Sequence, residues 1–173
     1  RTRSGRLSSC GFIVLMASRQ EEFKHESVEP WLTARTQEGW DVTRRGNSIT
    51  LRVPRLKQPA DTFGKELIAL TTELRDTLRR GGVLIRAGIV APSDDALGPL
   101  ALIDLARRLA VAVPYGELAM PTDLAKRLAI RVRPITAVSL PSGAEISGSA
   151  IGPNVADVTE QAPFYGRTRE LRL

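Results

Sequence analysis

An eight-residue run, CGFIVLMA at positions 10–17, limits the possible fold of this chain more than any other feature. A strand with one face in water alternates apolar and polar residues, whereas a continuous apolar run is typical of a strand covered on both faces. Basic residues before such a run are also typical of a secretory signal peptide. We favour a buried first strand because the run is so short. No other stretch approaches the roughly 18 apolar residues that span a bilayer.

Two amphipathic patterns predict the helices that cover this strand. The longer lies at 59–80, where Pro59 and Asp61 mark the start and a Gly-Gly pair marks the end. The shorter lies at 100–112. Their apolar residues recur every three or four positions: Phe63, Leu67, Leu70, Leu74 and Leu78 in the first, and Leu102, Leu105, Leu109 and Ala112 in the second. Both stripes need a sheet to pack against.

The remaining pattern predicts several short strands joined by tight turns. Residues 21–38 read as helical and divided by Pro30, and residues 122–129 as a helix with Thr122 as its N-cap. The predicted strands are 40–45 and 48–53 around Gly46-Asn47, then 83–90 and 116–120, and a closing hairpin of 134–140 and 144–151. This order predicts an α/β (α+β) fold, a ferredoxin-like split βαβ sandwich whose mixed, mostly antiparallel sheet is flanked by helices.

Charge and cysteine content narrow the function classes. The chain has 25 Lys and Arg against 19 Asp and Glu, a net charge of +6. The basic residues are scattered near the ends of predicted elements, and only 5% of residues are aromatic, so we expect solvated faces and no direct nucleic-acid binding. One cysteine, Cys10, and one histidine, His25, provide neither a disulfide nor a cysteine-rich zinc site. We therefore expect a reducing, cytoplasmic location, no membrane contact and no cofactor.

Three stretches, in the correct order, resemble the class III adenylate and guanylate cyclase domain. They are GFIVLMAS at 11–18, GWDVTRRGNSITLRVP at 39–54 with the helix that follows, and the segment from IRAGIV to DLAKRLA at 85–129. The last is the most specific, because RAGI, LARRL and GELAMP all keep the family's spacing. Together they cover about 120 residues, and the resemblance implies a cyclase-type domain over residues 10–152.

The resemblance also implies that the metal site is lost. Active cyclases carry one Asp at the end of the first strand and another in the hairpin, and these two residues hold two divalent cations. The aligned positions here are Ser18 and Asn47, neither of which is anionic. Hard cations favour anionic oxygen ligands, so we expect no metal. Two simpler interpretations remain: Ser18 as a helix N-cap, and Asn47 retained for its turn geometry alone.

Three further family positions have changed or lost their context. The family's transition-state Asn and Arg align with Asp104 and Arg108, and the lysine that reads adenine aligns with Thr43. Arg108 is therefore the one residue left for a phosphate contact, while an acidic neighbour repels a triphosphate. The alternative is that Arg108 simply pairs with Asp104 at i,i+4.

The end of the chain carries a second resemblance. APFYGRTREL at 162–171 resembles the stretch that opens the ATP-binding module of large bacterial regulators, before the Walker A strand. This implies that residues 153–173 are a linker into the missing ATP-binding domain of a STAND-type ATPase. Because the sequence starts without Met, we expect residues 1–9 to be a tail or cloning residues. The P-loop pattern GxxxxGK[ST] does not occur in the sequence.

Three functions compete at this stage. We favour a catalytically inactive cyclase homology domain that acts in signal transduction as a regulatory, dimerisation or sensing module, either as a homodimer or in contact with a C-terminal ATPase domain. The second is a divergent, active cyclase making cAMP or cGMP with Asp94 or Asp95 as substitute ligands. The third is an α/β protein-interaction module that shares only its topology with cyclases.

Overall fold

The computed structural model describes residues 10–92 and 97–152. The predictions for the tail 1–9, the linker 153–173 and the two loop carboxylates Asp94 and Asp95 lie outside these residues. In the part of the chain that the structure describes, no helix combines the length and apolar composition needed to cross a membrane.

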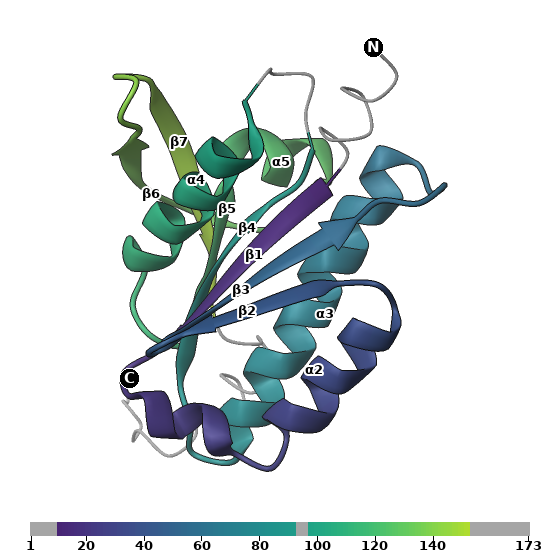
Figure 1. The fold of residues 1–173 in the computed structure, drawn as a ribbon. Helices are drawn as coiled ribbons and strands as arrows, with labels where there is room; N and C mark the ends of the chain where they lie inside the picture. Colours follow the sequence, from purple (N-terminus) through teal and green to yellow (C-terminus); the bar gives the residue numbers. More distant parts are fainter. Residues whose placement is uncertain (1–9, 93–96, 153–173) are drawn as a thin grey trace.

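A seven-stranded mixed sheet forms the centre of the fold, in the order β2-β3-β1-β4-β5-β7-β6 (Figure 1). Its neighbouring strands pair antiparallel except for β4 and β5. The strands are β1 (Cys10–Ala17), β2 (Asp41–Arg45), β3 (Ser48–Pro54), β4 (Ile85–Val90), β5 (Leu118–Pro121), β6 (Arg133–Ser139) and β7 (Glu145–Ile151). The predicted α/β fold with a mostly antiparallel sheet is confirmed, and β1 coincides with the apolar run.

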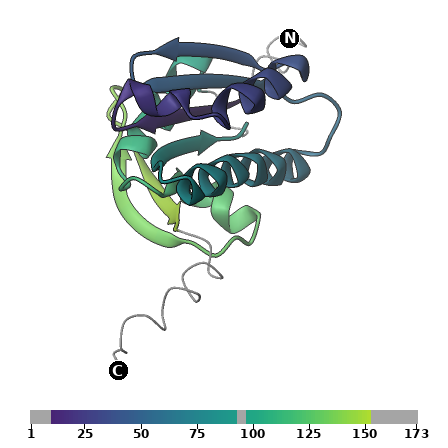
Figure 2. The same cartoon turned by 90° about the horizontal axis from the view of Figure 1, so that it is seen from below.

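The helices cover both faces of this sheet. They are the 3-10 helix η1 (Gln20–Lys24) and the α-helices α2 (Val28–Gln37), α3 (Ala60–Arg80), α4 (Pro99–Val111) and α5 (Thr122–Arg127). Figure 2 shows the long α3 running along one face of the sheet. The opposite face is covered by α4, which packs on β4, β1 and β5.

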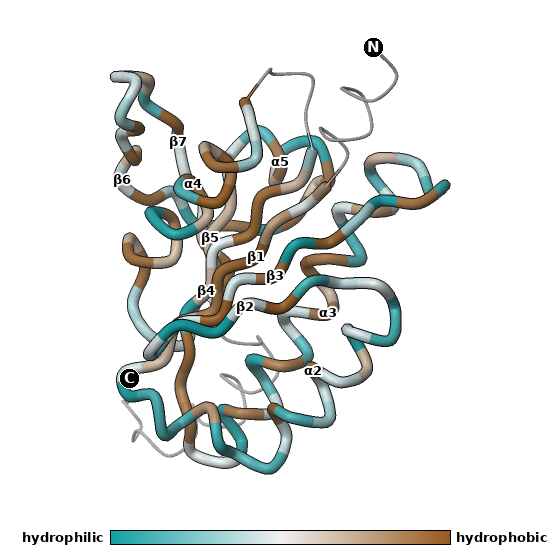
Figure 3. The backbone as a smooth tube through the Cα atoms, viewed as in Figure 1, coloured by the Kyte–Doolittle hydropathy of each residue, from teal (hydrophilic) through white to brown (hydrophobic). Residues whose placement is uncertain are grey.

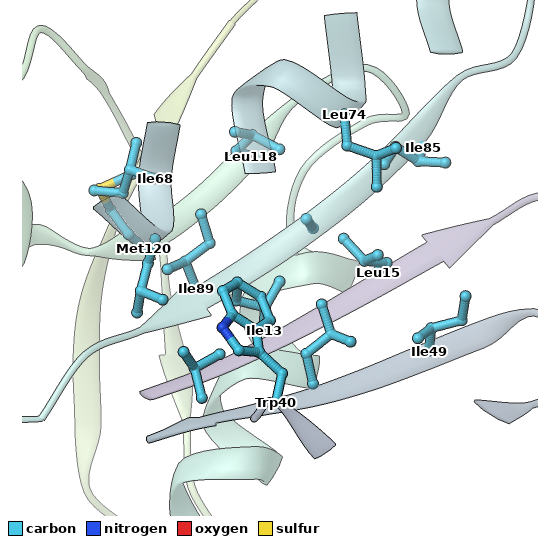
Figure 4. Close-up of a cluster of buried hydrophobic side chains, with 14 of the residues drawn as sticks. Ile13, Leu15, Trp40, Ile49, Ile68, Leu74, Ile85, Ile89, Leu118 and Met120 are labelled. Atoms are coloured by element: carbon cyan, nitrogen blue, oxygen red, sulfur yellow. The ribbon is translucent and has the colours of Figure 1, made fainter. Parts of the chain in front are cut away.

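Alternate residues of β1 enter two separate cores. Ile13, Leu15 and Ala17 pack with α2 and α3, together with Leu67 and Leu74 of the predicted stripe. Figure 4 shows part of this larger core, and Figure 3 shows how apolar residues gather along the central strands. On the other face, the side chains of β1 pack with α4: Phe12, Val14, Leu102, Leu105 and Leu109. The fully apolar run is explained, because β1 has no solvent-facing side.

Three local predictions are wrong. Pro30 does not divide the first helical segment: the break falls between η1 and α2, and Pro30 lies in the first turn of α2, where a missing N–H costs nothing. Thr122 is the first residue of α5 and caps nothing, because its hydroxyl bonds to that of Ser149 at 2.9 Å. Ala112 is exposed because α4 ends at Val111.

Candidate functional site

The structure brings Ser18 and Asn47 to the same end of the sheet, where β1 stops and the β2–β3 hairpin turns back. The amide N–H of Ala17 donates to the carbonyl oxygen of Asn47 at 3.0 Å. The side-chain Nδ2 of Asn47 donates in return to the carbonyl oxygen of Ala17 at 2.9 Å. These two bonds clip the hairpin onto the end of β1, immediately before Ser18.

The turn interpretation of Asn47 is therefore insufficient. Gly46 takes the left-handed conformation that the tight turn requires, with φ of +59°, and among the described non-glycine residues only Ala129 has a positive φ. The Asn47 side chain instead presents an N–H donor to a carbonyl oxygen. A carboxylate at this position would present no donor to that oxygen.

Ser18 is an exposed residue whose polar atoms are already bonded. Its backbone N–H and its Oγ both donate to Glu22 Oε1, at 3.1 and 2.8 Å. The N-cap interpretation is wrong, because Arg19 is the N-cap of η1 and makes no side-chain cap bond. The carboxylate of Glu22 instead reaches back from the first turn of η1 to Ser18, an arrangement that resembles the acidic half of a capping box.

No group of three or more His, Cys, Asp or Glu residues that could hold a metal ion occurs among residues 10–92 and 97–152. At the end of β1, the carboxylate of Glu22 is engaged by Ser18. Two divalent cations need several anionic oxygens, so the described residues at this end do not fit a two-metal centre.

Thr43 lies on β2, at the edge of the same sheet, beyond the strands that α4 covers. It pairs with Thr50 of β3, which pairs in turn with Val14 of β1, so Thr43 faces the side covered by α4. Since α4 packs on β1, β4 and β5, Thr43 stays exposed. A hydroxyl here offers no positive charge to a base.

Asp104 and Arg108 form the predicted i,i+4 pair on α4, with 2.7 Å between Arg108 Nε and Asp104 Oδ2. Arg108 Nη1 also donates to the carbonyl oxygen of Ser139, at the end of β6, at 2.8 Å. The sheet order places β6 at the edge opposite the β2–β3 hairpin. Within one chain, the structure thus brings Ser18 and Asn47 together and directs Arg108 toward the other edge.

Sequence reasoning missed a cluster at the end of β1. The hydroxyl of Tyr115 lies 3.5 Å from the carbonyl oxygen of Ala17. The guanidinium of Arg86 stacks 4.4 Å from the centre of the Tyr115 ring, and its Nη1 donates to the carbonyl oxygens of Val111 and Val113, at 3.3 and 3.2 Å. No local sequence pattern predicts this cluster, because its members come from β1, β4 and the turn before β5, which are far apart in the sequence.

Comparison with known proteins supports one conclusion about the fold. No family model matches the sequence, and no curated protein matches it significantly. Among solved structures, the catalytic core of a rhodopsin-guanylyl cyclase with converted specificity, in complex with ATPαS, superposes with a TM-score of 0.62 at 8% identity, over 83% of this chain and 95% of that one. The adenylyl cyclase CyaB from P. aeruginosa gives 0.58 at 14% identity, over 84% and 95%.

A third structure is the non-canonical dimeric guanylyl cyclase domain of the RhoGC fusion protein from the aquatic fungus Blastocladiella emersonii. It gives a TM-score of 0.55 at 8% identity, over 82% of this chain and 94% of that one. The described chain therefore has the fold of the class III adenylate/guanylate cyclase domain, as the resemblance implied.

Proposed function

We propose that this chain is a catalytically silent cyclase homology domain that regulates a larger signalling ATPase by associating with a partner domain or by sensing. The observation that carries the proposal is the state of the two metal positions. Asn47 donates its amide to Ala17, and the hydroxyl of Ser18 is held by Glu22. Neither side chain offers an anionic oxygen to a cation.

The transition-state position supports the same conclusion. Arg108 is bonded to Asp104 and to the Ser139 carbonyl oxygen, so an incoming phosphate competes with two internal acceptors. Loss of one stabilising group at such a site costs on the order of a hundredfold or more in rate. The loss of both metal ligands, together with an Arg108 that is already engaged, removes most of the catalytic machinery.

The purified chain, given ATP or GTP with Mg²⁺ or Mn²⁺, is expected to form no cyclic nucleotide above background, while an active class III cyclase in the same assay does. The double variant Ser18→Asp with Asn47→Asp restores two carboxylates but is also expected to stay inactive, since Thr43, Asp104 and the engaged Arg108 remain. Metal-dependent formation of cyclic nucleotide by the unmodified chain would contradict the proposed catalytic inactivity and favour the alternative of a divergent, active cyclase.

Association is the second part of the proposal. One neighbour in fold is described as a dimeric guanylyl cyclase domain. Here α4 carries two exposed apolar residues, Leu100 at 83% and Val111 at 52% exposure. Exposed apolar residues on one helix are suited to burial against a partner.

Sedimentation equilibrium is expected to show self-association that Leu100→Glu with Val111→Glu weakens. Leu56→Glu, at a leucine outside α4 that is 74% exposed, is expected to leave it unchanged. A strict monomer at high concentration would contradict the homodimer. A monomer would still be compatible with contact to a C-terminal ATPase domain, which the resemblance of residues 162–171 supports. Expression of the reading frame beyond Leu173 tests this second form of association directly.

A further inference from the structure

Arg75 is a buried cation in the C-terminal half of α3. It is 1% exposed, although Arg is rarely buried unless it is paired. Its Nε donates to Asp76 Oδ1 at 2.7 Å, and its Nη1 donates to the carbonyl oxygens of Gly116 at 3.1 Å and Gly152 at 2.8 Å. One guanidinium thus ties α3 to the segment before β5 and to the residue after β7. We refer to Gly152 as the exit residue, because it directly follows β7.

A continuous series of backbone contacts leads from the β2–β3 hairpin to this guanidinium. Asn47 is bonded twice to Ala17. Ala17 is paired with Ile85 across β1 and β4. The N–H of Gly116 donates to the carbonyl oxygen of Ile85 at 2.6 Å, and the Gly116 carbonyl oxygen accepts from Arg75. In Figure 1 the hairpin and the end of β1 lie together at the lower left, where β4 begins.

Two features make this route sensitive to displacement. Gly116 has φ of +100°, a conformation that other residues rarely adopt, and its carbonyl oxygen accepts from the same Nη1 of Arg75 that donates to the carbonyl oxygen of Gly152. Arg75 has no water to replace a lost bond, because its side chain is almost fully buried, and a buried guanidinium left without acceptors is costly. A shift of Gly116 therefore changes the bonds that Arg75 makes at the exit residue.

We propose that this route is a conformational relay, in which a change at the β2–β3 hairpin is transmitted through β1, β4 and Arg75 to the exit residue. Only the biological role of the relay rests on the proposed regulatory function. In that role, the relay would transmit a conformational change at the β2–β3 hairpin to residues 153–173. Its existence is independent of catalytic silence. Contact along a route is not yet coupling, so the test measures the coupling itself.

The test uses amide hydrogen exchange in the whole 173-residue chain. Asn47→Ala removes the side-chain bond to Ala17 and is expected to speed exchange at Ile151 and Gly152 by about threefold or more. In an Arg75→Met background, the same hairpin substitution is expected to add no further increase. Because coupling is reciprocal, Arg75→Lys, which keeps the charge but not the fork of donors, is expected to speed exchange of the Ala17 amide.

Arg44→Ala is the matched control. Arg44 lies in the same hairpin, but its bonds run to Glu29 of α2, at 2.7 and 2.8 Å, and not to β1. It is expected to leave exchange at the exit residue unchanged. The relay is refuted by unchanged exit exchange in Asn47→Ala, by an equal effect of Arg44→Ala, or by an Asn47→Ala effect that persists without Arg75. If Arg75→Met unfolds, Arg75→Lys takes its place in the double variant, with the same outcomes deciding.

Discussion

Gly88 of β4 is the position where one methyl group is expected to be most damaging. A Cβ placed on it would lie 1.9 Å from the carbonyl oxygen of Ala106 in α4, and 2.9 Å from the amide nitrogen of Ala110. Real Cβ contacts do not fall below 3.0 Å, so α4 must move outward by more than about 1 Å. The clash is with helix backbone, which no change of side-chain rotamer relieves.

The cost of Gly88→Ala follows from what α4 covers. Overpacking a core costs about 1–3 kcal/mol, and we expect the upper end here, because moving α4 loosens its whole contact with Phe12 and Val14. For a chain of this size, about 3 kcal/mol corresponds to a melting temperature about 6–12 °C lower. Urea unfolding followed by circular dichroism measures the loss directly, and two-state behaviour is checked with a second probe.

Gly148→Ala in β7 provides the matched control. Its added Cβ would meet only side-chain atoms, Ile135 at 3.0 Å and Leu109 at 3.2 Å, which can shift. We expect a loss of about 1 kcal/mol or less there. A Gly88→Ala protein whose free energy of unfolding is within 1 kcal/mol of the parent, or equal to that of Gly148→Ala, would refute the tight contact between β4 and α4.

Two further substitutions test local contacts. Asn47→Asp places a carboxylate against the carbonyl oxygen that the amide now bonds, and is expected to cost about 1–3 kcal/mol at pH 7. Because the protonated acid can donate to that oxygen, the loss should shrink as pH falls toward 4 in urea titrations; a constant loss would contradict the contact. Arg35→Ala removes a guanidinium 5.1 Å from the ring of Trp31 and 5.8 Å from that of Trp40, and is expected to cost about 1 kcal/mol and to change tryptophan emission. An emission spectrum no different from that of the exposed-site variant Arg80→Ala would contradict the cation-π contact.

Local sequence pattern determined most of the elements of this fold. The run at 10–17 matched β1 to the residue, and the stripe of Phe63, Leu67 and Leu74 located α3 to within one residue at its start. Burial of a repeating apolar face depends on spacings of two or three to four residues, which can be read without knowing the fold. The same reading misplaced Thr122, because its hydroxyl bonds to a strand that lies 27 residues away.

Part of the candidate site was predicted from the family resemblance, and part is seen only in the tertiary structure. The resemblance paired Ser18 with Asn47, and the two bonds between Asn47 and Ala17 explain how they meet, but only the structure shows that Glu22 holds the serine hydroxyl. Sequence spacing also anticipated the pair of Asp104 and Arg108, because i,i+4 contacts are local. The second bond of that Arg, to a carbonyl oxygen in a distant strand, was not local and was not foreseen.

By itself, the sequence determined which segments are strands and helices, because the spacing of apolar residues is a property of near neighbours. The loss of the two metal ligands at Ser18 and Asn47 is what the resemblance implied. Only the tertiary structure decided how Arg75 is satisfied. Its acceptors at Gly116 and Gly152 lie 41 and 77 residues away. Both acceptors are backbone carbonyl oxygens, which every residue has, so no residue type in the sequence marks them. From the sequence alone, an arginine in an amphipathic helix is predicted to be exposed to solvent. Its burial becomes favourable only when distant backbone carbonyl groups accept its hydrogen bonds.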